Sequence, residues 1–198
     1  MSKLILASAS ATRAQMLKKS GVIFDVEVPL VDEDNWKTSL IAEGVSPSGI
    51  ADALADTKAR SVSQTHADAY VIGADQVLVQ DGQLLSKATD RHEAQQTLKA
   101  LSDSKHTLLS AVVVYQNGEP VWRTLGKATL TARPLSDVFI EAYLDALGDD
   151  AFWSVGCYQI EGLGAQLFTD VDGDQFTVLG LPLLPLLDFL RRIGCMPL

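Results

Sequence analysis

Two serine hydroxyls and an arginine guanidinium lie close together near the start of the chain. Ser8 and Ser10 follow a short apolar run, and Arg13 comes three residues after Ser10, at the beginning of a predicted helix. Free N–H groups and the dipole at a helix N-terminus favour phosphate, and arginine adds a charged, forked donor. The alternative is a serine cap beside a solvated arginine. The chain has no Gly-x-x-x-x-Gly-Lys-Ser/Thr sequence, which argues against a P-loop kinase or GTPase.

Two carboxylates are candidates for metal binding and proton transfer. Asp75 ends a predicted buried strand in the sequence Gly-Ala-Asp-Gln, at a sheet edge where α/β folds often form active sites. It can bind Mg²⁺, which uses one or two carboxylates together with substrate phosphates, or it can take a proton from water. Glu33, in the acidic run 32–35, can supply a second carboxylate. The alternative for Asp75 is a turn-capping role. The alternative for Glu33 is a solvated charge run, and for Glu33 the residues alone favour that alternative.

Two lysines and a glycine-rich segment complete the set of candidates. Lys58, on a predicted helix, and Lys87, after a predicted hairpin, can bind phosphate, although most lysines are solvated surface residues. Residues 156–164 hold three glycines and Glu161, whose carboxylate can accept hydrogen bonds from the amino or imino edge of a base. The alternative is that these glycines only form turns.

The pattern of apolar residues predicts the elements that position these side chains. It predicts a mixed α/β (α+β) fold with one mixed sheet, in a single domain over residues 1–198 with two lobes around a cleft. Asp81-Gly82 and Asn117-Gly118 predict hairpin turns. Predicted strands cover residues 3–7, 24–28, 70–79, 107–115, 120–131, 165–169 and 176–179. Predicted helices cover residues 12–20, 47–63, 90–101, 136–147 and about 182–193, and the run 32–35 is predicted to be a loop.

Composition limits the class of protein. Acids outnumber bases by 25 to 16, giving a net charge of −9, whereas domains that bind nucleic acid carry a basic face, so no nucleic-acid partner is expected. The first apolar run is too short for a secretory signal, and the longest apolar stretch is broken by prolines. We therefore expect a cytoplasmic protein with no membrane partner.

Cys157 has no activating neighbour and is expected to be structural. The histidines show no metal-ligand spacing and are expected at the surface (His66, His92 and His106).

The candidate residues occur in an order that is specific as a set. The set comprises Ser8-Ala9-Ser10 with Arg13, Asp32-Glu33, Lys58, Gly73-Ala74-Asp75-Gln76, Lys87, Glu161-Gly162-Leu163-Gly164 and Gly180-Leu181-Pro182-Leu183. This ordered set resembles the Maf family, and the match runs nearly from end to end. The resemblance implies a hydrolase of nucleotide metabolism, acting on acid anhydrides, that cuts a nucleoside triphosphate into a monophosphate and pyrophosphate. It also implies an elongated mixed sheet with flanking helices and a central cleft, similar to inosine-triphosphate pyrophosphatases, a divalent cation (Mg²⁺, Mn²⁺ or Co²⁺) and a homodimer.

The resemblance also implies roles for individual residues. The residues implied to hold phosphates are Ser8, Ser10, Arg13, Lys58 and Lys87. Glu33 and Asp75 are implied to hold the metal, with Asp75 also the base for the attacking water. Gln76 and Glu161 resemble the branch that prefers 7-methyl-GTP, and Thr12 stands where the branches differ, so these three are expected to set base preference. Two alanines, Ala11 and Ala14, replace a proline and a second arginine that the family usually carries.

Two other functions remain open from the sequence. Family members are linked with arrest of cell division, so one alternative is a nucleotide-binding inhibitor of septum formation with little catalysis. The other is a metal-independent phosphatase, which would release orthophosphate. Metal-dependent release of pyrophosphate would separate the enzyme from both.

Overall fold

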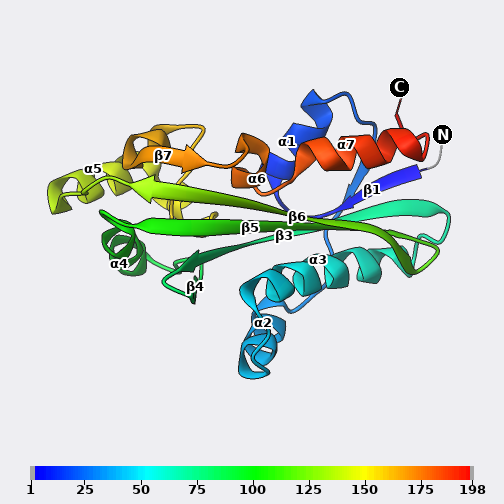
Figure 1. Ribbon diagram of the computed structural model, residues 1–198, viewed down its shortest axis with the longest axis horizontal. Coiled ribbons are helices and arrows are strands. Elements are labelled where there is room, and N and C mark those ends of the chain that lie inside the picture. The colour runs from blue at the N-terminus through cyan, green and yellow to red at the C-terminus, as the bar shows by residue number, and fades with distance from the viewer. Residues whose placement is uncertain (1–2, 197–198) are drawn as a thin grey trace. The chain divides into compact units, whose positions relative to one another are not determined.

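The computed structural model describes residues 3–196 and contains one seven-stranded mixed sheet. The strand order is β2-β1-β3-β5-β6-β7, and β4 pairs with β3. Strand β1 runs parallel to both β2 and β3, whereas β4 and β7 pair antiparallel with β3 and β6. Helices flank the sheet (Figure 1), which confirms the predicted mixed α/β fold.

The elements follow the predicted ones closely. The strands are β1 (Lys3–Ala7), β2 (Asp25–Glu27), β3 (Ala69–Gln80), β4 (Gln83–Leu85), β5 (Lys105–Gln116), β6 (Glu119–Ala132) and β7 (Phe168–Asp172). The α-helices are α1 (Ala11–Lys19), α2 (Glu33–Ala42), α3 (Pro47–Ser63), α4 (Arg91–Leu101), α5 (Asp137–Leu147), α6 (Gln175–Val178) and α7 (Leu183–Arg192). The described residues also contain two 3₁₀ helices, η1 (Gly148–Phe152) and η2 (Leu163–Leu167).

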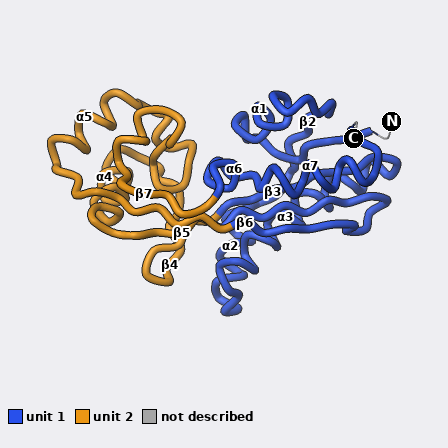
Figure 2. The backbone as a smooth tube through the Cα atoms, turned by 45° about the horizontal axis from the view of Figure 1, so that its top comes forward, with its two compact units in different colours: residues 1–76, 109–126, 174–198 blue, residues 77–108, 127–173 orange. Residues whose placement is uncertain are grey.

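The chain divides into two compact units (Figure 2). Unit 1 contains residues up to Gln76, residues 109–126 and residues from Asp174 onward. Unit 2 contains residues 77–108 and 127–173. The predicted single domain with two lobes around a cleft stays a prediction.

Unit 1 packs helices on both faces of its part of the sheet. Helices α1 and α7 lie on one face and α3 on the other (Figure 1). Helix α7 buries leucines at positions 183, 186, 187 and 190, the spacing of one helix face. The buried apolar cluster on the α7 side consists of Leu4, Leu6, Met16, Leu17, Val22, Ile72, Ala74, Val112, Val114, Leu181, Leu183, Leu186, Leu187, Phe189, Leu190 and Cys195.

Gly73 allows α3 to approach β3 unusually closely. A Cβ atom at this position would lie 2.1 Å from the carbonyl oxygen of Ala55 and 2.6 Å from the amide nitrogen of Ala59. Only glycine leaves room for this contact between a strand and helix backbone. The contact positions two candidate site residues, because Lys58 precedes Ala59 and Asp75 lies two residues after Gly73, on the same face of the strand.

Unit 2 contains the hairpin between β3 and β4 and the helices α4 and α5. Asp81 and Gly82 join β3 to β4 with φ angles of 49° and 78°, as the Asp-Gly pair predicted. Helix α4 is joined to α5 by an ion pair between Arg91 and Glu141, 2.7 Å long. Both partners are about half exposed, so this surface pair adds little stability.

Three secondary-structure predictions are wrong. Residues 165–167 of the predicted strand 165–169 belong to η2, and only residues 168 and 169 belong to β7. The other two concern residues 32–35 and 176–179. Residues 32–35 were predicted as a loop, but Asp32 caps α2 by accepting a hydrogen bond from the amide of Asn35, and the acidic residues that follow suit a helix N-terminus. The segment 176–179 was predicted as a strand, but most of it belongs to α6. Asp174 caps that helix at the amide of Thr177. In both cases a capping aspartate outweighs the local pattern.

The expectation that the histidines lie at the surface is wrong for His106. Its side chain is 2% exposed, and its Nε2 lies 2.8 Å from the hydroxyl oxygen of Tyr158. The rings of Tyr158 and Phe168 pack beside it. Burial lowers the pKa of His106 to about 4, so the folded protein holds this histidine neutral at neutral pH.

We expect acid to destabilise the fold through His106. Between pH 6.5 and 4 the unfolded chain binds a proton that the folded protein does not, so the free energy of unfolding falls as pH drops, by at most about 3 kcal/mol. Above pH 6.5 this residue contributes no pH dependence. Urea unfolding at pH 7.5 and pH 5 measures the effect. His106→Gln should flatten the fall, the exposed control His92→Gln should not, and an unchanged fall in His106→Gln would refute the assignment.

None of the helices within residues 3–196 is long and apolar enough to cross a bilayer.

Candidate functional site

The loop between β1 and α1 forms the predicted helix N-terminus. Ser10 caps α1, its hydroxyl oxygen accepting from the amide of Arg13 at 3.3 Å. Ser8 is buried, and its hydroxyl oxygen accepts from the amide of Ser10 at 3.2 Å. Because β1 and β3 are parallel and Ala7 pairs with Gly73, this loop leaves the sheet beside the segment that carries Asp75.

Arg13 is buried rather than solvated, so the alternative interpretation of its side chain is wrong. Its Nε donates to the carbonyl oxygen of Gly180 at 2.8 Å, and its Nη1 donates to that of Ala74 at 3.0 Å and to the Ser8 hydroxyl at 3.3 Å. Nη2 lies next to Gly180, where a Cβ atom built on that glycine would be 3.4 Å away. Burial lowers the pKa of Arg13 below its usual value, and the charges of Asp75 and Glu33 act against this change. The guanidinium is therefore fixed in place by two backbone carbonyls and a hydroxyl.

Lys58 brings the two predicted carboxylates together. Its Nζ lies 2.6 Å from Asp75 Oδ1 and 2.7 Å from Glu33 Oε2. Lys58 and Asp75 are buried, at 5% and 7% exposure, whereas the Glu33 side chain is 48% exposed. The contact between Lys58 and Asp75 is shielded from solvent, whereas the half-exposed Glu33 is the partner that solvent and ligands can reach.

Gln76 lies on the opposite face of β3 from Asp75 and is held by neighbours from two other segments. Its Nε2 donates to the Ser110 hydroxyl at 3.0 Å, to the carbonyl oxygen of Thr177 at 3.1 Å and to that of Val178 at 3.0 Å. Sequence reasoning did not identify these three partners as part of the site. Their positions, 34 to 102 residues away, give no local signal.

The chain is similar to known proteins along nearly all of its length. Residues 3–193 match the family model described as Maf-like protein. The chain belongs to the Maf family. Nucleoside triphosphate pyrophosphatases from Ruegeria pomeroyi and Caulobacter vibrioides are each 49% identical to it over 191 residues, which is 96% of either chain in both comparisons. A 7-methyl-GTP pyrophosphatase from Rhizobium meliloti is 46% identical over 191 residues, again 96% of each chain. The resemblance found from the motifs is confirmed.

The carboxylates of this Maf protein fit the divalent cation that the family resemblance implied. Glu33 and Asp75 already share one positive neighbour, and carboxylate oxygens are the ligands that Mg²⁺ prefers. The described residues contain no group of three or more His, Cys, Asp and Glu side chains that could hold a metal alone. The donor set therefore suits a cation that takes its remaining ligands from water and substrate phosphates. The cation itself stays a prediction.

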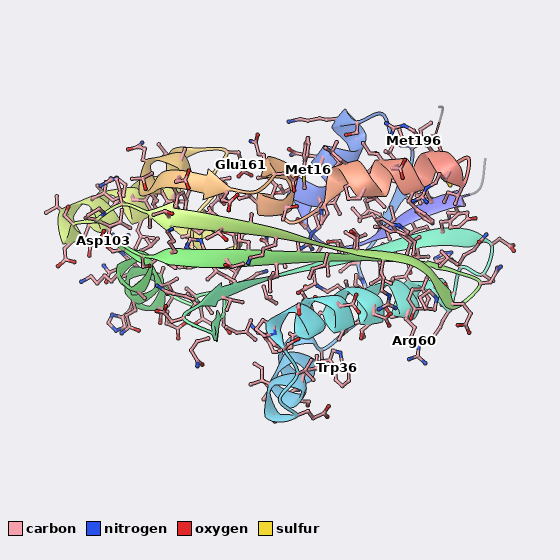
Figure 3. All side chains as sticks on the ribbon, in the orientation of Figure 1. Met16, Trp36, Arg60, Asp103, Glu161 and Met196 are labelled. Atoms are coloured by element: carbon pink, nitrogen blue, oxygen red, sulfur yellow. The ribbon has the colours of Figure 1, made fainter. Side chains whose placement is uncertain are left out.

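Two of the predicted Maf site residues lie in unit 2. Lys87 is exposed and follows β4, where it lines an open depression with Asp149, Phe152 and Trp153. Glu161 is exposed in the loop between η1 and η2 (labelled in Figure 3). Their predicted roles in phosphate and base binding stay predictions. Thr12, in the first turn of α1 in unit 1, is half-buried, and its role in base preference also stays a prediction.

Replacing Arg13 by lysine should weaken triphosphate binding. Lysine lacks the planar fork, so its single nitrogen cannot bond the Gly180 and Ala74 carbonyls while also facing an anion. We expect KM to rise about 10- to 100-fold, the range for losing a charged hydrogen bond. Steady-state kinetics should show no comparable change in the exposed control Arg191→Lys. A wild-type KM in Arg13→Lys would exclude this role.

Proposed function

We propose that this chain is a nucleoside triphosphate pyrophosphatase that uses a divalent cation to hydrolyse its substrate to a monophosphate and pyrophosphate. The contact between Lys58 and Asp75, 2.6 Å long and buried, carries the proposal. It places a cation suited to phosphate beside a carboxylate suited to accept a proton. The names of the similar proteins from Ruegeria and Caulobacter support the same activity.

The first step of the proposed mechanism is binding of the triphosphate tail. The helix N-terminus capped by Ser10 offers free N–H groups, and the anchored Arg13 offers Nη2. Lys58 adds a positive charge from the α3 side, and Lys87 is proposed to add another. Because Arg13 and Lys58 are buried and fixed by their partners, their charges need little reorganisation when negative charge develops.

The second step is hydrolysis. We propose that Asp75 accepts a proton from water while the water oxygen forms a bond to the α-phosphorus. The bond from that phosphorus to the oxygen bridging it to the β-phosphorus breaks, and pyrophosphate leaves with its charge shared by Arg13 and Lys58. When bound by Glu33 and Asp75, a divalent cation neutralises phosphate charge and makes bound water more acidic. In this proposal the buried Asp75 is the base, and the half-exposed Glu33 contributes only to binding the cation.

We also propose a substrate range and a setting for the enzyme. Guanosine triphosphate, including its 7-methylated form, is the proposed substrate. Gln76 and Glu161 are the basis, and a 7-methyl-GTP pyrophosphatase is 46% identical to this chain. A carboxylate at Glu161 suits the N1–H and amino donors of guanine. We further propose that the protein is a cytoplasmic homodimer. We propose that it acts on free nucleotides, since a net charge of −9 disfavours binding to nucleic acid and to anionic membranes.

A substrate panel tests this proposal. Purified protein is incubated with 7-methyl-GTP, GTP, dTTP, UTP and CTP, with Mg²⁺, Mn²⁺, Co²⁺ or EDTA. We expect pyrophosphate from the guanosine nucleotides with metal and none with EDTA. Turnover that survives EDTA would contradict the metal role, and faster turnover of dTTP and UTP would contradict the base preference. Nucleotide binding without turnover would instead favour the septum-formation inhibitor.

A further inference from the structure

The amide of Gln76 has its donor side fully engaged by the protein. Three acceptors lie 3.0 to 3.1 Å from Nε2, namely the Ser110 hydroxyl and the carbonyl oxygens of Thr177 and Val178. An amide nitrogen has only two N–H groups, so these neighbours occupy both. The remaining group of the side chain, the carbonyl oxygen Oε1, is an acceptor only.

The orientation of this amide is fixed by the chemistry of its neighbours. The Ser110 hydroxyl donates its single hydrogen to the Thr177 carbonyl at 2.8 Å, which leaves its lone pairs to accept from Gln76. A flipped amide would set Oε1 against two carbonyl oxygens and leave both N–H groups without these acceptors. Only the observed orientation lets the Gln76 amide donate to the Ser110 hydroxyl and to the carbonyl oxygens of Thr177 and Val178.

The neighbours that hold the amide are themselves rigid. Ser110 and Thr177 are fully buried. The amide and hydroxyl of Thr177 donate to the Asp174 carboxylate, and its carbonyl also accepts from the amide of Gly180 at 3.0 Å. Side chains held by such a network keep one geometry when a ligand arrives.

The carbonyl oxygen of Gln76 and the guanidinium of Arg13 both lie next to Gly180. A Cβ atom placed on Gly180 would lie 3.7 Å from Gln76 Oε1 and 3.4 Å from both Nε and Nη2 of Arg13. The absence of a side chain at Gly180 thus leaves space next to both groups. One of them is a cationic donor and the other is a neutral acceptor. Phosphate oxygens are acceptors at neutral pH, so they suit Arg13 and not Gln76.

We propose that Ser110 is a positioning residue that holds Gln76 as a hydrogen-bond acceptor for a donor group of the nucleoside. This inference rests on the proposed function, because it assigns part of the same substrate to Gln76. The donor is either an N–H group of the base or a sugar hydroxyl. Recognition of the nucleoside at Gln76 then depends on Ser110, which acts only through the amide of Gln76.

Calorimetric binding of α,β-methylene-GTP with Mg²⁺ tests the inference without turnover. Gln76→Ala should weaken binding about 5- to 10-fold, as expected for one lost hydrogen bond. Gln76→Glu keeps an acceptor but loses the N–H groups and faces two carbonyls, so it should bind no better than Gln76→Ala. Ser110→Ala should weaken binding about 3-fold, a part of the same hydrogen bond. Ser110→Thr, which keeps the hydroxyl, should bind like the wild type.

Two further measurements separate positioning from general structure. Ser110→Ala should have no additional effect in the Gln76→Ala background, because it acts only through that amide. Inorganic tripolyphosphate, which lacks a nucleoside, should bind all neutral variants equally, and its affinity for Gln76→Glu corrects for the added charge. The 2′,3′-dideoxy form of the analogue distinguishes the source of the donor. Loss of the Gln76 effect with this form assigns the donor to the sugar, and persistence assigns it to the base.

The inference is overturned if Ser110→Ala binds like the wild type, if its effect adds to that of Gln76→Ala, or if tripolyphosphate binding falls equally. Tight binding of the nucleotide by Gln76→Glu after the charge correction would also overturn it. Wild-type binding that shows the expected pattern without any pyrophosphate release would sink the proposed function and leave this inference standing. A wild-type protein that binds no nucleoside triphosphate would overturn both.

Discussion

Asp75→Asn should lower kcat by about 10²- to 10⁴-fold, the contribution of a general base. Asparagine has the same shape as aspartate, and its side-chain oxygen can still accept the hydrogen bond that Lys58 now donates to Asp75 Oδ1 at 2.6 Å. It cannot take a proton from water, and it is a poorer ligand for a divalent cation. The chemical step should therefore fail while the fold and most of the nucleotide affinity survive.

Three measurements on the same preparation check this expectation. Pyrophosphate release gives kcat, calorimetry with tripolyphosphate gives the affinity for the phosphate tail, and thermal unfolding gives Tm. Asp68→Asn, a change of the same kind at an exposed position before β3, is the matched control and should leave all three unchanged. A kcat within about threefold of the wild type in Asp75→Asn would rule out Asp75 as the base, since general base catalysis is worth far more.

Gly73→Ala should destabilise the protein more than any other single methyl addition at its glycines. The new Cβ would lie 2.1 Å from the Ala55 carbonyl oxygen and 2.6 Å from the Ala59 amide nitrogen, both backbone atoms of α3 that cannot rotate away. Helix and strand would have to separate, which loosens the buried face of α3 and moves Lys58 away from Asp75. We expect a loss of about 3 kcal/mol or more in the free energy of unfolding.

Gly162→Ala provides the matched control for this steric argument. A Cβ at Gly162 would approach no atom closer than 3.8 Å, so Gly162→Ala adds the same methyl without a collision. Its φ of −128° and ψ of −137° lie outside the main β region, so this variant carries a backbone cost but no steric one. Urea unfolding should therefore place Gly73→Ala far below Gly162→Ala. Equal midpoints for Gly73→Ala and the wild type would mean that α3 does not need the close approach.

Most elements could be predicted from the sequence because their signals are local. Serines and an aspartate at positions 10, 90 and 136 cap helices where such residues are expected, and Asp81-Gly82 and Asn117-Gly118 form the predicted turns. The failures at 32–35 and 176–179 also have a local cause, since Asp32 and Asp174 begin helices that the apolar pattern hid. Burial of His106 depends on partners 52 and more residues away and left no local trace.

Only part of the candidate site could be predicted from local sequence signals. The types and order of Arg13, Glu33, Lys58 and Asp75 predicted their chemistry, and the structure brings Lys58 within 2.7 Å of both carboxylates. Their burial could not be predicted, because it arises from packing between α1, α3 and the segment around Gly180. The contacts that fix Gln76 come from residues more than thirty positions away and required the fold.

The identity of the products tests the central claim most directly. Phosphorus NMR of GTP and 7-methyl-GTP incubated with the protein and Mg²⁺ resolves nucleoside monophosphate, pyrophosphate, nucleoside diphosphate and orthophosphate in one sample. The proposed mechanism predicts one monophosphate and one pyrophosphate for each triphosphate consumed, with no orthophosphate. Nucleoside diphosphate with orthophosphate, or an unchanged triphosphate in a protein that binds it, would contradict the assignment of this Maf protein as a pyrophosphatase.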